Sequence, residues 1–155
     1  MNSFDGFAIL APVPEEHLID GEEVCAREGR VAFGSRAWER FREVDTGRNG
    51  MSVEVLIYES GGLSKPEARW RATYVGHVES HNGAHPDGMR YRPPSTAKYE
   101  MDNKGYWAIF WEVSGLQRIP KGEEVKIRNL RGLGKKTYYS PTFIPEGPLL
   151  IEYPF

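Results

Sequence analysis

Hydrophobic and polar residues alternate along several stretches of the chain, with the period of two that is typical of half-buried β-strands. The clearest alternation runs through residues 51–60 (MSVEVLIYES) and 69–80 (RWRATYVGHVES). The stretch YWAIFWEV at 106–113 is largely apolar and aromatic, and is predicted to lie at the centre of the sheet. Further strands are predicted at 7–14 and 123–130, and four prolines confine the C-terminal segment to short edge strands.

One segment has clear helical spacing, SRAWERFREV at 35–44. Trp38 and Phe41 fall on one side of such a helix, charged residues cover the remainder, and Ser35 is expected to cap its start. The acidic segment 15–29 has only weak periodicity, which predicts a helical turn followed by a strand.

About six strands, one principal helix (35–44) and a long turn-rich loop (81–105) predict a β-rich α+β fold. The expected architecture is a small mixed β-barrel, closed or nearly closed, with the helix plugging one side. With 155 residues, 39% of them hydrophobic, the chain 1–155 is expected to form a single globular domain. It has no apolar run of the roughly 20 residues that cross a bilayer, and no basic leader, so we expect a cytoplasmic protein without membrane contact.

Three of the four histidines, His77, His81 and His85, follow one another at intervals of four. A helix would stack them on one face as metal ligands, but Pro86 and the neighbouring glycines disfavour a helix there. We therefore predict a strand histidine that is hydrogen-bonded in place and two solvated loop histidines, with no metal site. Zinc held by these histidines with a nearby carboxylate is the alternative.

The net charge of −2 hides an uneven distribution: residues 1–60 carry 12 acidic and 6 basic side chains, whereas 61–155 carry 10 and 14. The segment KIRNLRGLGKK (126–136) contains five basic residues and no acidic one. A basic surface of this kind can bind phosphates, and a solvated β-hairpin is the alternative. The candidate phosphate-binding residues are Arg90, Arg92, Lys126, Arg128, Arg131, Lys135 and Lys136.

Aromatic residues make up 12% of the chain. Such rings build small cores, and those that line a cavity can also stack on nucleobases. The chain carries no recognisable hydrolase, nucleotide-binding or zinc-protease motif. Its one cysteine, Cys25, lies among acidic residues that disfavour a thiolate, and is predicted to be a buried core residue. No cofactor is expected.

Residues from about 30 to 150, taken in order, resemble the PUA-like superfamily, and especially its EVE, YTH and ASCH branches. A strand ending VAFGS leads into the helix RAWERF and then into VEVLIYES, a strand of the kind that follows a helix in those domains. The next strand carries a glycine–valine step at Gly76 and Val78, and a later strand leads to Ile119-Pro120.

The resemblance implies a nucleic-acid-binding module that holds one base, modified or not, in an aromatic cavity, with DNA or RNA as partner. The flanking phosphates would be held by the basic residues without reading sequence. The residues that the resemblance places near such a cavity are Ser35, Trp38, Tyr58, Ser60, Trp70, Trp107 and Trp111.

Two alternatives belong to other functional classes. The ASCH branch includes small hydrolases of modified nucleosides, for which Glu59, Glu79, Lys98 and Glu112 are the nearest candidates by sequence. A cavity carboxylate paired with lysine or threonine would favour this chemistry, whereas rings alone favour binding. The other alternative is a protein-interaction or inhibitor domain, which predicts exposed aromatic residues on a convex face, together with loop 81–105.

Overall fold

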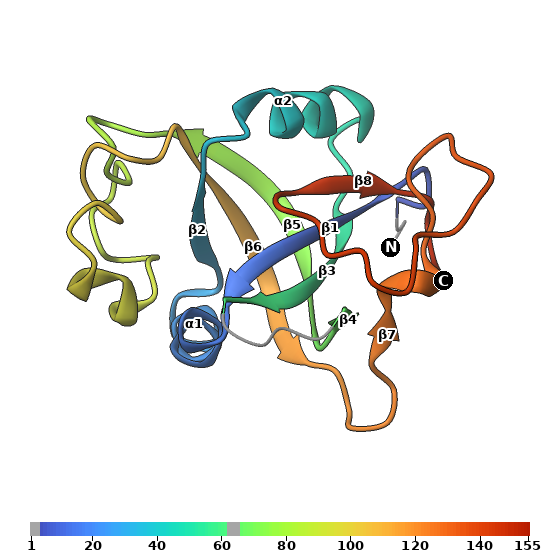
Figure 1. The fold of residues 1–155 in the computed structure, drawn as a ribbon. Helices are drawn as coiled ribbons and strands as arrows, with labels where there is room; N and C mark the ends of the chain where they lie inside the picture. The colour runs from blue at the N-terminus through green and yellow to red at the C-terminus, as the bar shows by residue number, and fades with distance from the viewer. Residues whose placement is uncertain (1–3, 62–65) are drawn as a thin grey trace.

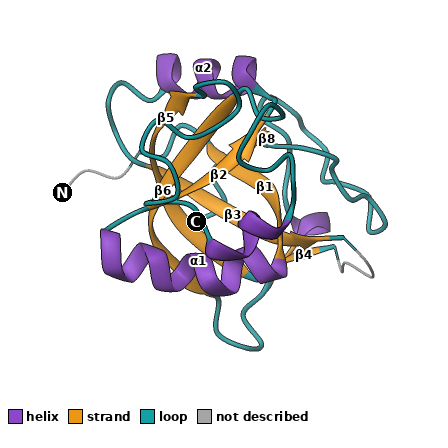
Figure 2. Ribbon diagram, turned by 90° about the vertical axis from the view of Figure 1, so that its left-hand side faces the viewer, coloured by secondary structure: helices purple, strands orange, loops and turns teal. Residues whose placement is uncertain are grey.

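The computed structural model describes residues 4–61 and 66–155. In these ranges the chain is a strand-rich α+β fold, with a six-stranded mixed sheet and a two-stranded sheet (Figure 1). The strands are β1 (Ala8–Pro14), β2 (Val31–Ser35), β3 (Val53–Ser60), β4 (Glu67–Ala68), β5 (Trp70–Glu79), β6 (Ile109–Arg118), β7 (Val125–Lys126) and β8 (Leu149–Ile151). The helices are α1 (Glu15–Glu28) and α2 (Trp38–Gly47), with 3-10 turns η1 (Pro94–Lys98) and η2 (Ile127–Asn129). The two α-helices lie at opposite ends of the sheet (Figures 1 and 2).

The larger sheet has the strand order β2-β6-β5-β3-β1-β8. β1 and β3 are parallel, whereas the other neighbouring strands are antiparallel. The parallel pairing is possible because α1, β2 and α2 lie between β1 and β3 in the chain. This long connection brings the chain back to the end of the sheet at which β1 begins, so that β3 can run in the same direction. Both strands therefore end side by side, with Pro14 opposite Ser60. In the described chain the order ends at β2 and β8, and a pairing that would close the sheet into a barrel is not observed.

β1 and β3 are buried on both faces. Val55 and Ile57 of β3 pack into the main core with the side chains of β5, β6 and α2, while Leu56 and Tyr58 pack into a second core near η2 and β8. Strands covered on both faces carry nearly continuous apolar runs, as in AILAPV of β1. β5 is instead buried on one face only. In its first half every second residue, Trp70, Ala72 and Tyr74, is buried, and the residues between them are partly exposed.

The predicted strands at 7–14, 51–60 and 69–80 are confirmed as β1, β3 and β5. The predicted strand at 106–113 begins later and ends later, as β6. Its predicted position at the centre of the sheet is wrong, because β6 is the second strand from the β2 edge. The strand predicted at 123–130 is wrong for most of its length. Only Val125–Lys126 form a strand, β7, and the 3-10 turn η2 follows at Ile127–Asn129. The chain turns there because Ile127 is fully buried and its N–H donates to the carbonyl of Pro66 at 2.9 Å.

The segment 15–29, predicted as a turn and a strand, is instead the fourteen-residue helix α1. One face of α1 is buried against β2, β6 and η1. Gly29, with φ of 85°, ends the helix in the left-handed conformation that favours glycine. Cys25 on the buried face confirms the predicted core cysteine.

The helix predicted at 35–44 is α2, displaced toward the C-terminus. Ser35 is the last residue of β2 and not a helix cap. Its hydroxyl accepts the backbone N–H of Ala37 at 3.0 Å, which shapes the turn into α2. The strand and the helix thus meet at a buried hydroxyl, next to the cavity described below.

The three histidines do not share a face. His77 lies in β5 with Nδ1 at 2.6 Å from Asp45, and His81 is exposed in the loop. The prediction that both loop histidines are solvated is wrong for His85, which is buried. Its Nδ1 accepts the N–H of Asp87 at 3.0 Å, so its Nε2 carries the proton and donates to Glu112 at 2.8 Å. This bond ties loop 81–105 to β6. Among the described residues no group of three or more histidine, cysteine or acidic side chains could hold a metal ion.

Candidate functional site

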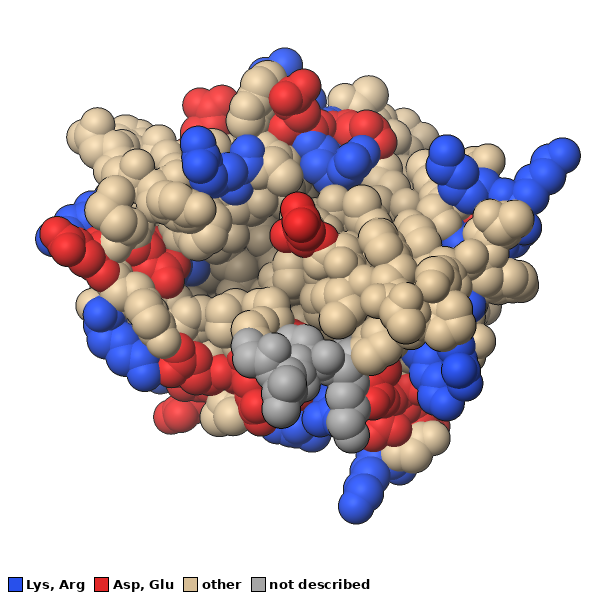
Figure 3. All heavy atoms as spheres, in the orientation of Figure 1, with Lys and Arg blue, Asp and Glu red and all other residues tan. Residues whose placement is uncertain are grey.

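A cavity of about 700 Å³ opens where β1 and β3 end, between α1, the β2–α2 junction, the end of loop 81–105 and the segment that precedes β8. It forms the hollow to the left of centre in the space-filling view (Figure 3). Cavities of 300–1,000 Å³ are the size that proteins use for small organic ligands. Its wall contains aromatic rings, and a group of charged and polar side chains lies at the α1 side.

Trp107 supplies a fixed ring in this wall. Its indole Nε1–H donates to Asp102 Oδ1 at 2.8 Å, and its ring makes a T-shaped contact with that of Tyr106, with the ring centroids 4.5 Å apart. The indole lies over Gly34 of β2, where a Cβ would overlap the ring atoms. Trp111 and Phe33 line the cavity deeper in, where they join the main core. A ring held in place before binding is suited to stacking, because little conformational freedom is lost when a ligand arrives.

Arg92 lies below this wall with only 1% of its surface exposed. Its guanidinium donates to Asn103 Oδ1, to the carbonyl of Ala32 and to Asp102 Oδ1, each at 2.8 Å. Burial lowers the pKa of Arg92 to about 10, and the charge of Asp102 opposes this shift. Arg92 therefore stays charged at neutral pH, and fixes Asp102 in the cavity wall.

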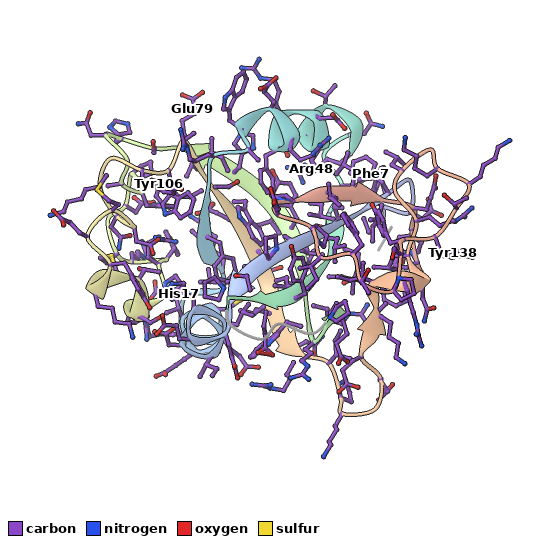
Figure 4. The ribbon with its side chains drawn as sticks, in the orientation of Figure 1. Phe7, His17, Arg48, Glu79, Tyr106 and Tyr138 are labelled. Carbon is purple, nitrogen blue, oxygen red and sulfur yellow. The ribbon has the colours of Figure 1, made fainter. Side chains whose placement is uncertain are left out.

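His17 faces the same group from α1 (Figure 4). Its Nδ1 lies 2.7 Å from Ser95 Oγ in η1, and its Nε2 lies 3.8 Å from Asp102 Oδ2. Burial lowers the pKa of His17, although the charges of Asp102 and Glu16 act in the opposite direction. His17 is thus held in the neutral form at neutral pH.

The lowered pKa of His17 predicts that acid destabilises the fold. Below its ordinary pKa, about 6.5, the unfolded chain binds a proton at His17 that the folded chain binds less readily, so unfolding is favoured as the pH falls toward the folded-state value. Urea unfolding of the wild type and of His17→Phe, compared at pH 7.5, 6.5 and 5.5, should show a steeper loss in the wild type. Parallel pH profiles would contradict the prediction.

The contact between Gly34 and Trp107 gives a second prediction. Gly34→Ala should force the indole from its place, with a loss of about 1–3 kcal/mol in the free energy of unfolding, as is usual for overpacking. In a Trp107→Ala background the same substitution should cost much less, because the overlapping ring is gone. Urea unfolding of the four proteins measures this coupling, and additive effects would contradict it.

The structure brings five of the seven base-binding candidates together and leaves two elsewhere. Those that line the cavity are Ser35, Tyr58, Ser60, Trp107 and Trp111. Tyr58 donates its hydroxyl to the carbonyl of Pro145, and burial raises its pKa to about 12, so it acts mainly as a support for the segment before β8. Trp38, 43% exposed, borders a second cavity of about 280 Å³ instead. Trp70 is in the main core under the guanidinium of Arg118.

The phosphate-binding candidates do not form one surface. Arg92 is buried and bonded as described, so it is not open to a phosphate. Arg90 is exposed and bonds Glu28 at 2.8 Å. Lys126 and Arg128 border a shallow depression with Pro66. The remaining three, Arg131, Lys135 and Lys136, precede Tyr138, which lies on the opposite side of the molecule from His17 and Tyr106 (Figure 4).

The hydrolase candidates do not meet in the cavity. Glu59 pairs with Arg69, and burial and Glu15 raise its pKa. Glu79 borders the smaller cavity. Lys98 pairs with Glu16 on the surface, and Glu112 is bonded to His85.

Sequence reasoning missed several residues that line the cavity, among them His17, Asp102 and Tyr106. His17 lies in a helix that the hydrophobic pattern does not indicate. Asp102 and Tyr106 belong to a polar loop in which no local motif distinguishes them from solvated residues. Tyr106 alone had a signal, because it is the first residue of the apolar stretch 106–113.

A scan against protein-family models finds no match to this chain, and a search of curated proteins finds none either. Neither α-helix of the described chain has the length and apolar character needed to cross a membrane.

Proposed function

We propose that this protein binds nucleic acid and holds a single extruded base in the cavity beside Trp107. The observation that carries the proposal is the fixed indole, bonded to Asp102 and lying over Gly34 in the wall of a cavity of about 700 Å³. Stacking of one base on an aromatic side chain contributes about 1–3 kcal/mol and does not depend on the base. In this proposal the polar group formed by Asp102 and His17 would contact the edge of that base.

A PUA-like fold of the EVE, YTH and ASCH kind, with a nearly closed barrel, is part of this proposal. It is supported by the six-stranded mixed sheet and by α2, which leads into β3. It is also supported by the position of the cavity, which adjoins Ser35 at the turn into α2. Arg131, Lys135 and Lys136 precede Tyr138, on the opposite side of the molecule from the cavity residues His17 and Tyr106 (Figure 4), so they would contact phosphates distant from the bound base and not the flanking ones. These residues form no ion pair with another described residue, and Tyr138 beside them is 63% exposed.

The partners of the carboxylates that line the cavity favour binding over hydrolysis. Asp102 is bonded to Arg92 and Trp107, and among the described residues neither it nor Glu146, the other acidic residue lining the cavity, is paired with a lysine or a threonine. The site is also concave, whereas a docking domain would present its aromatic residues on a convex face.

Quenching of tryptophan fluorescence tests the proposal, because Trp107 and Trp111 both line the cavity. Single-stranded DNA, single-stranded RNA and duplex DNA, with and without modified bases, are titrated at two salt concentrations. Saturable quenching that is stronger for single strands and persists at the higher salt is expected. Quenching that vanishes with salt and shows no dependence on the bases would leave only weak phosphate binding.

A further inference from the structure

Two hydrogen-bond acceptors lie side by side at the α1 side of the cavity, Asp102 Oδ2 and His17 Nε2. They are 3.8 Å apart, and both side chains are largely buried, with exposed fractions of 15% and 8%. Among the described residues neither atom has a hydrogen-bond partner at normal distance. Both residues line the cavity.

The neighbours of His17 fix which of its nitrogens carries the proton. Ser95 Oγ lies 2.8 Å from Asp20 Oδ1, and the carboxylate can only accept, so the hydroxyl proton points to Asp20. Ser95 Oγ must then accept from His17 Nδ1, which is therefore the protonated nitrogen of the neutral ring. Nε2 is left as an acceptor.

The neighbours of Asp102 fix its orientation in the same way. Its Oδ1 accepts from Arg92 and from Trp107, both at 2.8 Å. Its other oxygen is turned toward His17. One carboxylate thus connects the stacking ring to the polar end of the cavity, and it presents a negatively charged acceptor there.

We propose, on the basis of the proposed function, that this acceptor pair reads the exocyclic amino group of an extruded base. An amino group carries two hydrogens, one for Asp102 Oδ2 and one for His17 Nε2, and acceptors 3.8 Å apart can both reach it with modest bending. A keto oxygen at the same position would face two acceptors and find no donor. The site therefore selects amino-bearing bases, such as cytosine and adenine, over keto-bearing uracil and hypoxanthine.

Protonation of His17 would end this preference, because Nε2 would become a donor and pair with Asp102. Burial holds the ring neutral, while Glu16 and Asp20 on α1, and Asp102 from the loop, favour the charged form, and Arg92 opposes it. Tyr99 meets the imidazole edge-on, with centroids 5.6 Å apart. The preference should accordingly be full at pH 7.5 and decrease in acid.

The test compares five-nucleotide strands that are identical except for a central cytosine or uracil between abasic sites, so that phosphate contacts are equal. Affinities are measured by fluorescence quenching at pH 7.5 with DNA and RNA arms. A preference for cytosine of about 10- to 100-fold is expected, the range for one to two hydrogen bonds to charged or polar acceptors. Adenine should likewise be preferred over hypoxanthine, and methylation of the cytosine amino group should weaken binding.

His17→Phe is the matched variant, since it keeps a ring against Tyr99 and removes the acceptor. It should lower the affinity for cytosine and leave that for uracil unchanged, and Asp102→Asn should reduce the preference further. Equal affinity of the wild type for cytosine and uracil, or a preference that His17→Phe leaves intact, would overturn the inference while the proposed function stands. Failure of every strand to bind would overturn both.

Discussion

Replacing Arg92 with methionine should lower the free energy of unfolding by about 3–5 kcal/mol, the cost of breaking a buried ion pair by removing one partner. The substitution removes the guanidinium donor from Asn103, from the carbonyl of Ala32 and from Asp102, which keeps only the bond from Trp107. Stabilities of most domains are only about 5–15 kcal/mol, so the loss would be a large part of the total. Urea unfolding measures it directly.

Arg90→Met is the matched control, because Arg90 is two residues away, exposed, and paired with Glu28 at the surface. It should change the stability little, since exposed ion pairs contribute little. Lysine at position 92 should not restore stability, because it cannot make three bonds in fixed directions. An Arg92→Met protein as stable as Arg90→Met would show that the buried network does not hold the loop.

Replacing Trp107 with alanine should weaken binding of a single-stranded ligand by about 1–3 kcal/mol, or roughly 5- to 150-fold in affinity, because the stacking ring is lost. Trp107→Phe should retain part of the affinity, since it keeps a ring but loses the bond to Asp102. The measurement is a titration by fluorescence anisotropy of a labelled strand, which does not depend on the tryptophan signal.

Trp38→Ala provides the comparison for this series. Trp38 is 43% exposed and borders the smaller cavity, so its removal should leave the affinity unchanged. Equal losses for Trp107→Ala and Trp38→Ala would mean that the ligand does not enter the larger cavity. The outcome also separates the two tryptophans that sequence reasoning placed in one site.

The strands could be predicted because their side chains alternate or run apolar, as in β3 and β5. Helix α1 could not, because two of the residues that bury its face are His17 and Gly21, which a hydrophobic pattern does not count. A Cβ at Gly21 would lie 3.5 Å from Pro93 and 3.6 Å from Phe33, which is ordinary van der Waals contact, so the position is closely packed but does not require glycine. The buried face of the helix is therefore only partly marked by large apolar residues.

The candidate site was predictable where it rests on strands and not where it rests on the loop. Ser35, Tyr58 and Ser60 lie at or near the ends of β2 and β3, and it was the resemblance to the PUA-like superfamily that placed them near a cavity. Arg92 was predicted as a phosphate ligand because a charged residue in a polar loop is usually exposed to solvent. Its burial depends on contacts with Ala32 and Asp102, which become neighbours only when the chain folds.

The most direct test of the central claim is the indole N–H resonance of Trp107, observed by NMR on protein labelled with ¹⁵N and assigned by its loss in Trp107→Phe. A short strand with one cytosine between abasic sites is titrated into the wild type. If a base enters the cavity, the Trp107 resonance should shift with saturation while that of Trp38 stays in place. A Trp107 resonance that is unmoved at ligand concentrations that saturate binding would contradict the account.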